Sequence, residues 1–137
     1  MKNFILIISL LFTSILFAQK PIKFTADSFY FSKLLDGNNS CSKPQKASIF
    51  ITLDLEKRNV KIFNSKEHVI KIVNNVSPFN ETTENTFFDY KCIDENNKDC
   101  TARFLRYSKS SKSEMGELLY IVYPDITYVY TITKIKN

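Results

Sequence analysis

The chain has 137 residues and a formal net charge of +5, with charges of both signs interspersed along it. It contains two glycines and four prolines, which excludes collagen-like, low-complexity and linker-rich architectures. The modest positive excess is typical of a solvated surface, and because no basic block or nucleic-acid motif accompanies it, we expect no nucleic-acid partner.

Residues 1–18 have the pattern of a secretory signal peptide. Lys2 supplies a positive charge, an apolar run follows over 4–17, and Ala18 is a small residue at the expected cleavage point. The run is shorter than the roughly 20 apolar residues of a membrane anchor, although a retained anchor is the alternative, and no Cys follows it for lipid attachment. We therefore expect a secreted or periplasmic protein whose mature part, residues 19–137, is a single β-domain without a transmembrane segment.

The first mature segment, residues 22–32, is ambiguous between strand and helix. Phe29 and Phe31 alternate with Ser28 and Tyr30, which favours a strand. Thr25 could instead cap a short helix that ends near Gly37. We predict the strand, because the rest of the chain shows a period of two.

Alternating apolar residues over 48–55 and again over 60–64 predict a β-hairpin with a four-residue polar loop. A three-residue turn then leads into a further strand over 68–73. The expected cross-strand partners are Leu55 with Val60, Leu53 with Ile62, Asp54 with Lys61, Ile70 with Ile62, and Ile72 with Val60.

Four more strands are predicted after a polar loop over 74–85, at 86–93, 99–107, 117–123 and 126–135. In the last hairpin, alternation places Leu119, Ile121, Tyr128 and Tyr130 on one face and Leu118, Tyr120, Val122 and Val129 on the other. The predicted fold is an all-β antiparallel meander of seven to eight strands, either a small barrel or a two-sheet sandwich.

Cys92 and Cys100 flank a polar turn centred on Asn96. A loop with an odd number of residues places the two cysteines directly opposite each other, at a spacing that suits a disulfide. In an oxidising compartment we therefore predict a structural Cys92–Cys100 disulfide. Cys41, in the polar loop 36–46, is left over as a free thiol, an intermolecular disulfide partner or a nucleophile.

The sequence shows no catalytic, metal-binding or cofactor-binding motif. His68 is the single histidine, so a Cys–His pair would require it to meet Cys41 from another hairpin. The acidic turn at 94–99 lacks the glycine and distant glutamate of a calcium loop. The Ser/Lys run at 108–113 has the composition of a solvated loop. We predict no catalytic residue, metal or cofactor.

Tyrosines concentrate near the C-terminus and form the candidate binding surface, which comprises Tyr120, Tyr123, Tyr128 and Tyr130. Aromatic side chains on a sheet stack against sugars or against a partner's apolar groups. The alternative is that they serve only core and cross-strand packing.

The mature chain resembles small, secreted, all-β bacterial proteins that have no assigned activity. The stretches that carry the resemblance are residues 51–55 with 61–65, residues 90–94 with Cys100, and the tyrosine-rich end. The resemblance implies the fold and transfers no functional residue.

Two classes of function remain. The first is a small exported binding or interaction module for an unknown protein, glycan or small molecule. The second is an extracytoplasmic hydrolase whose site is assembled from distant loops. A cluster of Asp, Glu or His in one deep pocket would favour the enzyme, whereas an exposed patch of Tyr and Lys would favour the binder.

Overall fold

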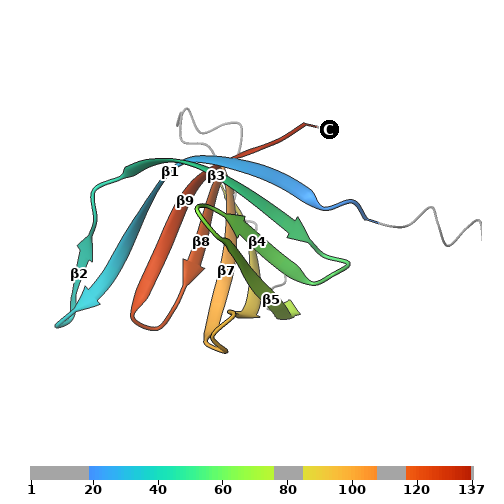
Figure 1. Ribbon diagram of the computed structural model, residues 1–137. Helices are drawn as coiled ribbons and strands as arrows, with labels where there is room; N and C mark the ends of the chain where they lie inside the picture. The colour runs from blue at the N-terminus through green and yellow to red at the C-terminus, as the bar shows by residue number, and fades with distance from the viewer. Residues whose placement is uncertain (1–18, 76–84, 108–116, 137) are drawn as a thin grey trace, which may run out of the picture.

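The computed structural model describes residues 19–75, 85–107 and 117–136, and within these ranges all regular secondary structure is β-strand (Figure 1). The strands are β1 (Ile22–Leu35), β2 (Asn38–Cys41), β3 (Gln45–Asp54), β4 (Asn59–Phe63), β5 (Glu67–Asn75), β6 (Asn85–Ile93), β7 (Asp99–Tyr107), β8 (Glu117–Val122) and β9 (Ile126–Lys134).

Eight of these strands close into an antiparallel barrel. Each of β3 to β8 pairs with the strand that follows it, and β1 pairs with both β3 and β9, which joins the two ends of the meander. Closure satisfies the backbone groups that a sheet edge would leave unpaired. The all-β meander and the small barrel are thus confirmed, in place of a two-sheet sandwich.

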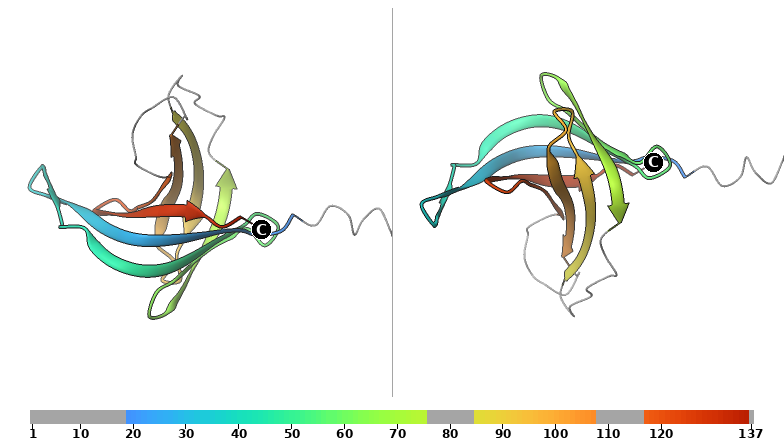
Figure 2. Two further views of the ribbon diagram at one scale, coloured as in Figure 1. Left: turned by 90° about the horizontal axis from the view of Figure 1, so that it is seen from above. Right: turned by 90° about the horizontal axis from the view of Figure 1, so that it is seen from below.

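The long strand β1 holds the barrel together. Its pairing with β9 extends from Phe24 to Lys33, with a bulge between Ala26 and Ser28. The predicted strand over 22–32 is therefore confirmed and the helix alternative is wrong. The far end of β1 turns through Asp36 and Gly37, both with positive φ, into the short strand β2. Figure 2 shows this β1–β2 hairpin projecting beyond the barrel.

The core lies inside the barrel and is built from alternate residues of the eight barrel strands, whereas the residues of β2 are exposed. Burying one such aliphatic side chain contributes about 1.5–3 kcal/mol. The largest fully buried side chains are Ile51, Val60, Leu119 and Ile132.

The predicted register of the first hairpin is wrong by two residues. Leu53 pairs with Val60, and Asp54 pairs with Asn59 rather than with Lys61. The Asp54 carboxylate accepts a hydrogen bond from the backbone N–H of Lys57 at 2.9 Å, so the loop begins one residue earlier than expected. A shift of two residues keeps the same side chains in the core.

The predicted register of the second hairpin is also wrong by two residues. Val60 pairs with Ile70 and Ile62 pairs with His68, because the turn occupies residues 64–66. The predicted partners Ile70–Ile62 and Ile72–Val60 are therefore wrong. The observed strand β5 begins one residue before His68, which therefore lies inside the strand rather than at its start.

The expected signal peptide, most of the loop over 74–85 and the Ser/Lys run at 108–113 lie outside the described residues. In the part of the chain that the structure describes, no helix is long and apolar enough to cross a membrane.

Candidate functional site: a tyrosine-lined cavity

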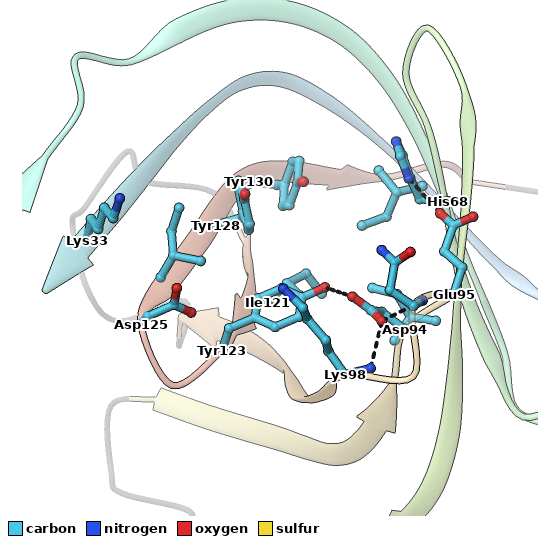
Figure 3. A pocket seen from close by; sticks show the side chains of 14 residues that line it. Lys33, His68, Asp94, Glu95, Lys98, Ile121, Tyr123, Asp125, Tyr128 and Tyr130 are labelled. Carbon is cyan, nitrogen blue, oxygen red and sulfur yellow. Dashed lines mark hydrogen bonds and ion pairs between the residues drawn. The ribbon is translucent and has the colours of Figure 1, made fainter.

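The end of the barrel formed by the turns at 64–66, 94–98 and 123–125 is hollowed by a cavity of about 540 Å³ (Figure 3). We call it the tyrosine cavity. Its volume lies within the roughly 300–1,000 Å³ of small-molecule sites. The lining residues are Lys33, Ile62, His68, Ile70, Asp94, Glu95, Asn96, Lys98, Ile121, Tyr123, Asp125, Ile126, Tyr128 and Tyr130.

Aromatic side chains form one wall of the tyrosine cavity. Tyr128 packs edge-on against Tyr123, with ring centroids 6.2 Å apart, and against Phe31 at 6.5 Å. Tyr130 stacks on Phe29 at 6.0 Å. The contacts with Phe29 and Phe31 follow from the β1–β9 register, which places Phe29 opposite Tyr130 and Phe31 opposite Tyr128. The wall therefore presents aromatic rings that pack against one another and remain partly exposed.

The structure divides the predicted tyrosine group. Tyr123, Tyr128 and Tyr130 line the cavity. Tyr120 alternates with the core residues Leu119 and Ile121, so it lies on the outer face, opposite Val129 of β9. The four tyrosines do not form one surface, because alternation along β8 sends Tyr120 outward.

Asp94 organises the turn between β6 and β7. Its Oδ1 accepts hydrogen bonds from the backbone N–H groups of Asn96 at 2.8 Å and Lys98 at 2.9 Å. Its Oδ2 accepts a hydrogen bond from the Tyr123 hydroxyl at 3.1 Å. These bonds, first the one from Lys98, lower the pKa of Asp94 below its ordinary value. Asp94 is thus an ionised residue that positions the turn and Tyr123, and it is unsuited to donate a proton.

Two cavity tyrosines retain their hydroxyl protons at neutral pH. Burial is the main cause that raises the pKa of Tyr130 to about 12 and that raises the pKa of Tyr123 still further. The Tyr123 hydroxyl donates its hydrogen bond to Asp94, and the Tyr130 hydroxyl is a potential donor to a ligand.

A histidine–carboxylate pair lies at the rim of the tyrosine cavity. The Nδ1 of His68 is 2.7 Å from Oε1 of Glu95, and the two side chains are 54% and 49% exposed. Sequence reasoning missed this pair because His68 is on β5 and Glu95 is in the β6–β7 turn, 27 residues away. Only the pairing of β5 with β6 brings them together. Cys41, by contrast, is exposed on β2.

The rest of the rim carries charges of both signs, from Lys33, Lys98 and Asp125 (Figure 3). Within the described residues, no group of three or more His, Cys, Asp or Glu side chains is arranged to hold a metal ion.

Cys92 and Cys100 are directly opposite each other on β6 and β7, as the sequence predicts. Both are buried, and the structure contains them as free thiols rather than as the predicted disulfide. The Cys92 thiol donates a hydrogen bond to the carbonyl of Tyr90 at 3.3 Å. Burial is the main cause that raises the pKa of Cys92 to about 11 and of Cys100 to about 12, so both thiols are protonated at neutral pH.

No protein-family model matches the chain, and neither a curated protein nor a solved structure similar to it was found. Its function must therefore be inferred from the geometry of the barrel.

Proposed function

We propose that the protein is a small exported binding module that takes up a small molecule in the tyrosine cavity. The observation that carries the proposal is an open cavity of about 540 Å³ that combines an aromatic wall with a mixed polar rim. Such a site suits a ligand with one flat or apolar face, such as a sugar ring or an aromatic ring, and with polar substituents directed toward the rim.

Export is part of this proposal and rests on residues 1–18. In an oxidising compartment the facing thiols of Cys92 and Cys100 are expected to form the disulfide, since they are already cross-strand partners. The bond would close the hairpin whose turn carries Asp94, Glu95 and Lys98. Its role would be to hold the rim of the tyrosine cavity in place.

Binding is favoured over hydrolysis because the carboxylates of Asp94 and Glu95 at the cavity are already engaged by other groups of the protein. The Asp94 carboxylate is engaged by three donors, and Glu95 pairs with an exposed histidine. One observation favours the alternative hydrolase: His68 with Glu95 resembles a general base with its orienting carboxylate. For that alternative, His68→Gln should abolish hydrolysis of chromogenic esters or glycosides, while Tyr120→Ala, on the outer face, should retain it.

The binding proposal is tested by titrating isotope-labelled protein with methyl β-glucoside, N-acetylglucosamine and indole while recording backbone amide shifts. A ligand of the proposed kind should shift amides of the turns at 94–98 and 123–125. Tyr128→Ala should weaken that binding about tenfold or more, as expected for loss of an aromatic stacking contact with its buried area. The matched control Tyr120→Ala should leave it unchanged. Shifts confined to the outer face, or none with any of the three compounds, would contradict the proposal.

A further inference from the structure

The opposite end of the barrel holds a second cavity, of about 290 Å³, which we call the apolar cavity. It shares no lining residue with the tyrosine cavity, and the fully buried residues of the core lie between the two. Its lining consists of Ile22, Phe24, Leu53, Leu55, Phe88, Tyr90, Phe104, Leu105, Arg106, Glu117, Ile132 and Lys134.

The wall of the apolar cavity is preformed by ring contacts. Phe104 packs against Phe24 with centroids 5.7 Å apart and edge-on against Tyr90 at 6.2 Å. Two large apolar side chains at its mouth remain exposed, Leu55 at 39% and Phe88 at 36%. Exposed aliphatic and aromatic carbon beside a cavity is the surface that an apolar ligand would remove from water.

The rim of the apolar cavity carries a positive excess among the described residues. Arg106 is 3.4 Å from Glu117, so these two charges offset each other. Lys134, opposite Phe24 on β9, is exposed and adds a further positive charge. A ligand that fills the apolar interior would therefore meet the positive charge of Lys134 with its polar end.

We propose that the apolar cavity binds a single-chain amphiphilic anion, with its hydrocarbon chain inside and its carboxylate at Lys134. If each methylene fills about the 30 Å³ share of one liquid water, the cavity holds a chain of about eight to ten carbons. This site is separate from the tyrosine cavity, and it stands or falls independently of the proposed function.

The chain has no tryptophan, so a single introduced tryptophan reports on one end of the barrel alone. Leu55→Trp places the reporter at the mouth of the apolar cavity, and Tyr128→Trp places it in the tyrosine cavity. Both variants are titrated with octanoate, nonanoate, decanoate and dodecanoate below their micelle concentrations. Phe88→Trp serves as a second reporter if Leu55→Trp fails to fold.

The expected result is an emission change in Leu55→Trp and none in Tyr128→Trp. Affinity should rise about fourfold with each methylene up to decanoate, which corresponds to burial of one CH₂ group, and then level off. No change in either reporter of the apolar end, or an equal change at both ends, would overturn the proposal. A change with phosphatidylglycerol vesicles but not with monomeric decanoate would also overturn it, in favour of contact with a membrane.

The charge assignment is tested in the Leu55→Trp background. Lys134→Met should weaken decanoate binding about two- to fivefold, as expected for an exposed ion pair. Lys23→Met is the matched control, because Lys23 is exposed next to the inward-facing Phe24, and it should change nothing. Decyltrimethylammonium should bind more weakly than decanoate. Equal binding of the cation and the anion, or an unaffected Lys134→Met, would refute the role of charge.

Discussion

The two ends of the barrel are built from the same strands yet differ in chemistry. Strand β9 contributes Tyr128 and Tyr130 to one cavity and Ile132 and Lys134 to the other. The tyrosine cavity is bordered by short turns with hydrogen-bonded polar groups, whereas the apolar cavity is walled by phenylalanines and aliphatic residues. The comparison shows that inward-facing positions at the two ends of one strand line separate cavities, with a packed core between them.

The two ends also depend on different interactions for their shape. At the tyrosine cavity, the Asp94 carboxylate holds the turn and Tyr123 through hydrogen bonds. At the apolar cavity, Phe104 is 7% exposed and holds its neighbours by packing. Substitutions at the two ends should therefore differ in their effect on stability, and the following predictions test this from the largest effect to the smallest.

Phe104→Ala should destabilise the protein by about 3–5 kcal/mol, because it leaves a cavity between Phe24 and Tyr90. Tyr128→Ala, at a partly exposed position, should cost about half as much. Urea denaturation of both variants measures the difference. Equal costs would mean that the tyrosine wall is as tightly packed as the apolar one.

Oxidation of Cys92 and Cys100 to a disulfide should stabilise the protein by about 2.5 kcal/mol over the reduced form, since it closes a loop of nine residues. Denaturation with and without reductant measures this, and Cys92→Ala with Cys100→Ala is the control. In the reduced native protein, iodoacetamide at pH 8 should modify the exposed Cys41 and spare the other two, because burial raises their pKa. Rapid modification of all three cysteines would show that this hairpin opens.

Asp94→Asn should destabilise the tyrosine end by about 1 kcal/mol, since the turn loses charge-assisted hydrogen bonds. The pKa of Asp94 is lowered in the folded protein, so its contribution is present above the unfolded value of about 3.9 and is lost as the pH falls through the folded value. Stability should therefore fall less steeply between pH 5 and pH 3 in Asp94→Asn than in the wild type. Parallel pH profiles would contradict this assignment.

His68→Gln should change stability by no more than about 0.5 kcal/mol, because both members of the His68–Glu95 pair are about half exposed. Thermal denaturation at pH 6 and pH 8 measures the effect. A loss of 2 kcal/mol or more would show that this pair holds the turn at 94–98 against β5.

Local patterning predicted much of the fold, and its errors have identifiable causes. The turn between Cys92 and Cys100 is symmetric about Asn96, so the number of residues in the turn predicts that the two cysteines are cross-strand partners. The predicted register of the first hairpin is wrong because Asp54, expected to pair with Lys61, ends β3 opposite Asn59 and accepts a hydrogen bond from the turn. A side chain such as that of Asp54 competes with the carbonyl groups of the neighbouring strand for backbone N–H groups. A pattern of apolar residues does not reveal this competition.

The tyrosine group illustrates the same limit at the candidate site. Alternation correctly predicted that Tyr128 and Tyr130 share a face with Leu119 and that Tyr120 lies on the other face. The candidate surface nevertheless joined the tyrosines because they are close in sequence. Parity along the strand is the signal that separates Tyr120 from the others. No comparable signal links His68 to Glu95, since they come from different hairpins.

The sequence by itself determined the all-β class, the hairpin order, the inward and outward faces of the strands and the facing positions of Cys92 and Cys100, because these depend on a period of two and on short turns. Only the tertiary structure decided the closure of β1 on β9, the rim pair of His68 and Glu95, and the two opposed cavities. Those features depend on pairings between distant segments, whose register and curvature are set by the packing of the whole barrel.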